Sequence, residues 1–153
     1  MKFTEKQLQQ INDLVVRYNF CTLETQQKLH AAGFFEKVRC NLHLCIFSND
    51  NDCRVVLEND LRLYGNYSDK VLNYSSNVKV IIPMPTLGDI WDLLPVSIKF
   101  GYYLTMTKRE VCYVSLNSQE LNPDRIERHN SSENPCEAMC LLWLQLNEKG
   151  FIR

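Results

Sequence analysis

Prolines at positions 83, 85 and 95 constrain the fold of this chain more than any other feature of its sequence. Proline lacks a backbone N–H and pushes the residue before it toward extended geometry, so a helix cannot begin before Pro85 and must end before Pro95. Thr86 is a suitable N-cap, with Asp89 in the first turn. The sequence therefore predicts a strand end, a turn and one short helix. The apolar face of this helix, which we expect to be buried, consists of Leu87, Ile90, Trp91 and Leu94.

Two helices are predicted before this turn. Thr4 opens a capping box that is followed by an apolar stripe, which indicates a helix over about 5–18. Thr22 can cap a second helix over about 23–32, and Gly33 suits the left-handed position at its C-terminal end. The N-terminal part of the chain is therefore predicted to be helical.

Strand patterns follow in the middle of the chain. Apolar residues alternate with others over 42–46, which indicates a strand with one buried face, and 53–57 can return beside it. Residues 78–82 form a further strand that leads into the prolines. The most regular hairpin joins 100–106 to 111–116, because both arms are rich in aromatic and β-branched residues.

A C-terminal helix closes the chain. Asn134 at the N-cap, Pro135 at the first helical position and Glu137 two residues later form a strong start signal, and Gly150 ends the helix. Apolar residues cover more than half of its circumference. Such a helix is either sandwiched inside the domain or shared with a second subunit, so a homodimer is expected.

These elements predict one α+β domain over residues 1–153, a length that suits a single core. Its helical N-terminal part covers about 4–33, and the sheet with the closing helix covers about 38–153. We expect an antiparallel sheet of about four or five strands, with two N-terminal helices, a short central helix and a C-terminal helix packed on it.

Charge and cysteine content limit the function classes. The formal net charge is -1, which makes nucleic acid an unexpected partner, and no apolar run approaches the length of a bilayer span. The N-terminus has no hydrophobic run of the kind that a signal peptide needs. Seven cysteines, an odd number without a Cys-x-x-Cys pair, indicate reduced thiols rather than a disulfide framework. A cytoplasmic protein without a membrane partner is therefore expected.

No motif for catalysis, phosphate binding or dinucleotide binding occurs, so we expect no enzyme and assign no catalytic residue, metal ligand or cofactor. The densest group of potential ligands is His43 with Cys45, which share one face of a predicted strand. Cys136 and Cys140 share a helix face one turn apart. Together these four could hold zinc, but nothing in the sequence indicates that the two segments meet.

Binding residues are predicted in two places. The polar stretch of about 58–78 carries Tyr64, Tyr67 and Tyr74 among asparagines and serines, residue types that make adaptable contacts. A second polar loop covers about 117–133. Trp91 is the other candidate, because an exposed tryptophan on the central helix would anchor a protein interface.

Three stretches, 22–34, 83–95 and 134–144, resemble a group of small uncharacterised proteins encoded by phages and mobile elements of gut Bacteroidota. The resemblance runs from Thr22 onward over most of the chain and rests on caps, prolines and core positions. It implies a phage or mobile-element origin and carries over no functional residue. The expected function is that of a non-enzymatic accessory protein acting through protein–protein interaction. The alternatives are a nucleic-acid-binding regulator that uses the N-terminal helix pair, and a small metal-binding protein or enzyme around His43.

Overall fold

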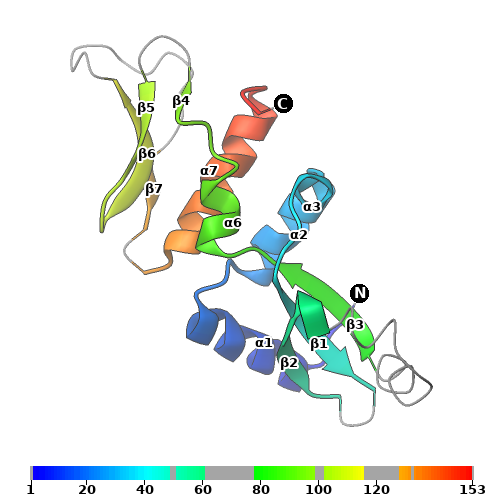
Figure 1. Ribbon diagram of the computed structural model, residues 1–153. Coiled ribbons are helices and arrows are strands. Elements are labelled where there is room, and N and C mark those ends of the chain that lie inside the picture. Colours follow the sequence, from blue (N-terminus) through cyan, green and yellow to red (C-terminus); the bar gives the residue numbers. More distant parts are fainter. Residues whose placement is uncertain are drawn as a thin grey trace.

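The computed structural model in Figure 1 describes residues 2–48, 51–60, 78–98, 102–115, 128–131 and 133–152. In chain order its elements are α1 (Glu5–Tyr18), α2 (Leu23–Ala31), α3 (Phe34–Lys37), β1 (Leu42–Phe47), β2 (Cys53–Leu57), β3 (Val78–Met84), α6 (Leu87–Trp91), β4 (Ser97–Ile98), β5 (Tyr102–Met106), β6 (Glu110–Ser115), β7 (His129–Asn130) and α7 (Pro135–Glu148).

The predicted α+β class is confirmed, but the strands form two antiparallel sheets instead of one. The first sheet has the order β2-β1-β3 and the second has the order β4-β5-β6-β7. Figure 1 shows the sheets on opposite sides of a central group of helices, α2, α6 and α7. The proline turn produces this division, because the chain leaves β3 through Pro85, forms α6 and starts the second sheet after Pro95.

In the first sheet, β1 lies between two partners. It pairs with β2 in the predicted hairpin, where Leu44 is opposite Val55, and with β3, where Leu44 is opposite Ile82. The prediction of a single buried face was wrong. His43 and Cys45 on the second face are buried as well as Leu44. Cysteine behaves as a small hydrophobe, so the apparent alternation was in fact a nearly continuous apolar run.

The second sheet contains the predicted β5–β6 hairpin and two short strands that the sequence did not indicate, β4 and β7. β7 pairs with the start of β6, with His129 opposite Val111. The N–H of Ser131 continues this contact by donating to the carbonyl of Arg109 at 2.8 Å. A strand of two residues has no periodicity to detect, which is why this segment was predicted as loop.

The predicted helix ends are confirmed at both termini of the chain. Thr4 forms a capping box with Gln7, and Gly33 adopts the left-handed conformation at φ 77° after α2. The side chain of Asn134 accepts from the N–H of Glu137 at 3.0 Å at the start of α7. Local side-chain–backbone hydrogen bonds therefore fix where these helices begin.

Helix α7 is the centre of the fold. It contacts α2, α6, β6 and β7, and the core cluster around it includes residues of both sheets. Trp143 is fully buried and meets Phe34 edge-on at a ring distance of 4.9 Å. Its own chain covers the helix, so the sandwiched alternative applies and α7 gives no reason to expect a second subunit. The homodimer stays a prediction. Within the described ranges, no helix is long and apolar enough to cross a membrane.

Candidate protein-interaction surface

Helix α6 is a short helix with well-fixed ends. At its start, the N–H of Thr86 donates to Asp89 Oδ2 at 2.8 Å, and the N–H of Asp89 donates to Thr86 Oγ1 at 3.3 Å. Its inner residue Ile90 is fully buried. The carbonyl of Pro85 accepts a hydrogen bond from Cys136 Sγ of α7 at 3.4 Å. Capping, packing and this contact hold α6 in one position on α7.

The outer side of α6 exposes apolar side chains. Trp91 is 44% exposed, Leu87 is 36% exposed and Met106 of the neighbouring β5 is 40% exposed. Leu87, Gly88, Trp91, Met106 and Met139 line a pocket of about 240 Å³, and we call this group the Trp91 surface. The expectation that the whole apolar face of α6 is buried was therefore wrong. Ile90 and Leu94 are buried, whereas Leu87 and Trp91 are partly exposed.

A basic turn borders the Trp91 surface. Met106 also lines a neighbouring hollow together with Lys108 and Ser131. Lys108 and Arg109 are exposed, and neither side chain has an acidic partner among the described residues. The turn is ordered, because Thr107 Oγ1 accepts from the backbone N–H of Arg109 at 3.1 Å. An apolar pocket therefore lies beside two positive charges that no acidic side chain among the described residues pairs.

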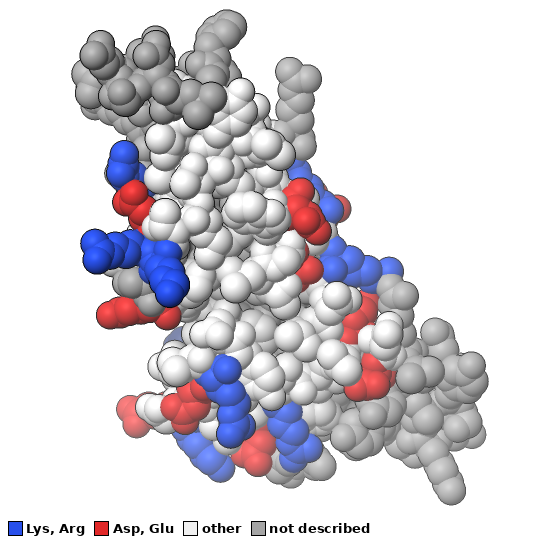
Figure 2. Space-filling view, turned by 60° about the vertical axis from the view of Figure 1, so that its left-hand side comes forward, with Lys and Arg blue, Asp and Glu red and all other residues white. Residues whose placement is uncertain are grey.

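Figure 2 shows how charge is distributed on one face of the molecule. A broad band without Lys, Arg, Asp or Glu runs along the middle of this face, with charged side chains on both sides of it. An uncharged band with charged margins is the arrangement expected of a protein interface, in which the centre loses charged residues and the rim keeps them.

The predicted binding residues fall into two groups. Trp91 lies on the exposed surface just described. Tyr64, Tyr67 and Tyr74, by contrast, lie outside the described residues. Sequence reasoning did not single out Met106 and Lys108. Met106 ends β5 and lines the pocket beside Trp91, whereas Lys108 lies in the hairpin turn that follows and lines the neighbouring hollow with Met106.

His43 is buried in the first sheet and lies in a small polar network that reaches the surface at Arg39. Its Nε2 is 3.2 Å from Glu58 Oε2, and Arg39 Nε donates to Glu58 Oε1 at 3.0 Å. His43 Nδ1 is buried without a hydrogen-bond partner. Burial lowers the pKa of His43, although the neighbouring carboxylate of Glu58 opposes this effect. The sequence analysis had identified neither Arg39 nor Glu58.

The cysteines do not assemble as the zinc alternative requires. Cys140 lies within hydrogen-bonding reach of Cys136 and Cys21, whereas Cys45 has Cys53 as its sulfur neighbour. Burial raises the pKa of Cys45 to about 11. Among the described residues, which include all seven cysteines, no group of three or more His, Cys, Asp or Glu side chains is arranged to hold a metal ion.

The N-terminal helix pair is built into the fold. The carboxylate of Glu137 accepts from the backbone N–H of Thr22 at 2.7 Å and also binds the hydroxyl of Thr25. On the other side of α2, Gln26 Nε2 donates to the carbonyl of Pro83 at 3.1 Å. The one lysine of α2, Lys28, is paired with Glu24 at 2.8 Å. Thr25 and Gln26 of α2 are therefore engaged in contacts within the protein.

Comparison of this chain with protein-family models, with curated proteins and with solved structures found no match.

Proposed function

We propose that this chain is a non-enzymatic accessory protein of a phage or mobile element that binds another protein through the Trp91 surface. The observation that carries the proposal is the exposure of Trp91 and Met106 beside a pocket of about 240 Å³ on a firmly held helix. Tryptophan dominates the binding energy of many interfaces, and methionine adapts to partners of different shape.

The chemistry of the Trp91 surface and of the basic turn beside it indicates which type of protein segment would bind there. The pocket is lined by apolar side chains and suits one apolar side chain of the partner. Lys108 and Arg109 beside it favour acidic residues next to that anchor. The expected partner is therefore a protein segment that combines an apolar anchor with neighbouring acidic residues. The homodimer stays a prediction about the oligomeric state of this chain.

Two further observations support the proposed cellular location and origin of the protein. All seven cysteines are free and buried, as expected in a reducing compartment, and this supports the proposal of a cytoplasmic protein. The resemblance of residues 22–34, 83–95 and 134–144 to phage and mobile-element proteins of gut Bacteroidota supports its origin.

The experiment compares proteins captured from lysates of Bacteroidota cells by the native chain, by Trp91→Ser and by Val16→Ser. Val16 is the matched control, because it is 77% exposed on α1, away from the Trp91 surface. A partner of the Trp91 surface binds the native chain and Val16→Ser equally. Its binding to Trp91→Ser falls by at least about tenfold, in the range of an interface hot spot.

A captured protein must also show the predicted chemistry. Crosslinks should map to an acidic segment of the partner. Lys108→Glu should weaken binding, and this loss of affinity should become smaller as the salt concentration rises. The proposal fails if every captured protein binds Trp91→Ser as well as the native chain, or if the crosslinked segments carry no acidic residues.

A further inference from the structure

A pocket of about 390 Å³ lies between the N-terminal helices and the first sheet. Its walls come from four parts of the chain, which are Phe3 before α1, one side of α2, Phe35 of α3 and the second half of β3. Its volume is within the range of pockets that enclose small molecules, roughly 300–1,000 Å³. The pocket shares no described residue with the Trp91 surface, so it is a separate candidate site.

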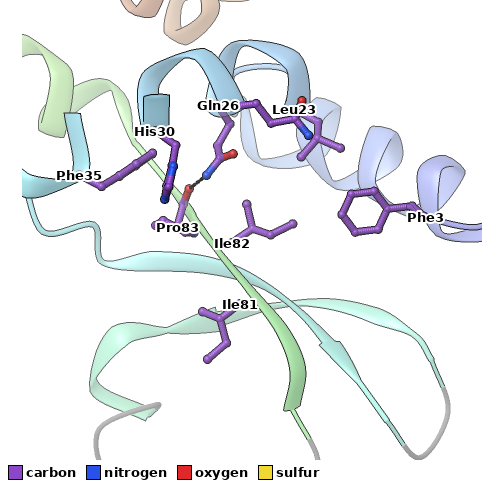
Figure 3. A pocket seen from close by; sticks show the side chains of 9 residues that line it. Phe3, Leu23, Gln26, His30, Phe35, Ile81, Ile82 and Pro83 are labelled. Carbon is purple, nitrogen blue, oxygen red and sulfur yellow. Dashed lines mark hydrogen bonds between the residues drawn. The ribbon is translucent and has the colours of Figure 1, made fainter. Parts of the chain in front are cut away.

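Most of the described lining is apolar, and part of it is aromatic. Figure 3 shows Phe35 and His30 at one end of the pocket and Phe3 at the other, with Ile82 between them. The rings of His30 and Phe35 have centres 6.2 Å apart and planes tilted by 42°. Aromatic rings pack well on one another in offset or edge-to-face arrangements. These walls therefore favour a flat aromatic ligand.

The described lining contains no Lys, Arg, Asp or Glu. A charged ligand would lose its hydration on entering and would meet no carboxylate, ammonium or guanidinium group of the described residues. The pocket therefore favours an uncharged ligand.

Gln26 supplies a buried polar group to the pocket. It is only 5% exposed, and its Nε2 donates to the carbonyl of Pro83 at 3.1 Å. Because a carbonyl only accepts, the amide nitrogen must face Pro83 and the amide oxygen must face away from it. Figure 3 shows this oxygen on the side of Leu23 and Ile82, and no described residue donates to it. A ligand with one N–H or O–H group would satisfy this acceptor.

We propose that this pocket binds a small, uncharged aromatic molecule that donates one hydrogen bond to Gln26 Oε1. The ring of the ligand packs between Phe3 and Phe35, over Ile82. Gln26 and Ile82 are both buried, so the donor must enter the pocket rather than lie across its mouth. A small molecule can enter as a whole, whereas a protein segment could insert only one side chain. This site does not rest on the function proposed for the Trp91 surface.

The first test compares indole with benzofuran, which has the same two-ring shape but carries a ring oxygen where indole has its N–H group. Chemical-shift titrations of the full-length, isotope-labelled protein under reducing conditions give both affinities and the location of binding. Indole should bind with a dissociation constant below about 1 mM. Benzofuran should bind at least about fivefold more weakly, because it leaves Gln26 Oε1 without a donor. The shifts caused by indole should centre on α2 and β3.

The second test assigns the donor to Gln26. Gln26→Met removes the acceptor and should reduce the preference for indole over benzofuran to less than about twofold. This ratio is informative even if both ligands bind the variant less tightly. Thermal unfolding checks that the variant is folded, and the comparison of the two ligands on the native chain needs no variant.

The third test concerns the aromatic wall. Phe35→Leu removes one ring of the pocket and should weaken indole binding at least about threefold. Tyr18→Leu is the matched control, because Tyr18 is an exposed aromatic residue of α1 that does not line the pocket, and it should bind indole like the native chain. Trp91→Ser should also bind indole within about twofold of the native chain, which separates this site from the Trp91 surface.

Several results would overturn the proposal. They are the absence of indole binding at 1 mM, equal binding of indole and benzofuran, or a preference for indole that Gln26→Met leaves unchanged. Tighter binding of N-acetyl-tryptophanamide than of indole would also overturn it, since the pocket would then suit a tryptophan side chain of a protein instead of a free small molecule.

Discussion

The two sheets of this protein pack around the same central helices but differ in how far their residues are exposed to solvent. In the first sheet, β1 has a strand on each side, and Leu44 and Cys45, which point to opposite faces, are both fully buried. In the second sheet, Tyr103 and Val114 lie opposite each other and are 42% and 37% exposed. One sheet is a buried layer, and the other keeps part of one face open to solvent.

This difference explains where exposed apolar groups occur. The two outer strands of the second sheet, β4 and β7, each pair through only two residues. β5 ends at Met106, which is part of the Trp91 surface. In the first sheet, β2 and β3 are the two outer strands, and each pairs with β1. The exposed apolar side chains of the Trp91 surface are therefore next to the second sheet.

The largest effect is expected from removing a side chain from the first sheet. Leu44→Ala should lower the free energy of unfolding by about 2–5 kcal/mol, because Leu44 is completely buried and leaves a cavity. The matched substitution in the second sheet, Leu104→Ala, should cost about 1 kcal/mol, since Leu104 is only partly buried. Urea unfolding measures both. Equal losses would show that the two sheets are protected alike.

The next effect tests whether the helices couple the two sheets. Glu137→Ala removes the acceptor for Thr22 and Thr25 and should lower the free energy of unfolding by about 2 kcal/mol. Glu133→Ala, just before α7, removes an exposed carboxylate and should change it by less than about 0.5 kcal/mol. Because α2 packs against the first sheet and α7 against the second, both sheets should unfold together. Separate transitions would contradict this coupling.

A smaller effect is expected in thiol reactivity. Cys112 in β6 should react with N-ethylmaleimide about tenfold faster than Cys45 in β1, because opening the short β7 exposes Cys112 while Cys45 needs the whole first sheet to open. Mass spectrometry of partly labelled native protein gives the order. Cys112→Ala should remove the fast reaction. Labelling of Cys45 before Cys112 would show that the first sheet opens more easily than the second, which would contradict this prediction.

The smallest effect is a pH dependence that belongs to the first sheet. Burial lowers the pKa of His43 below its ordinary value of 6.5, so the unfolded chain binds a proton more readily than the folded chain. The contribution of His43 to stability is therefore complete above pH 6.5 and declines as the pH falls below that value. Unfolding free energies measured across this range should lose part of their slope in His43→Gln. An unchanged slope would contradict the buried neutral imidazole.

The binding residues show the limits of sequence reasoning. The sequence allowed two interpretations of the apolar face of the central helix, a fully buried face or an exposed Trp91. The spacing of Leu87, Ile90 and Trp91 is the same in both cases, because it does not show whether a neighbouring element covers the face. The hydrogen bond between Gln26 and Pro83 joins residues far apart in the chain, and neither residue has a local signal for the other. The same holds for Cys140 and Cys21, which share a site that no spacing rule indicates.

The sequence by itself determined where the helices begin and where most strands lie. Thr4, Thr86 and Asn134 act on backbone groups within three residues, and alternation along a strand is also a local property. The tertiary structure alone decided the division into two sheets, the short pairing of β7 and the exposure of Trp91. These features depend on which distant surfaces meet. The free energy of that packing comes from residues far apart in the sequence, so no single stretch of the chain determines it.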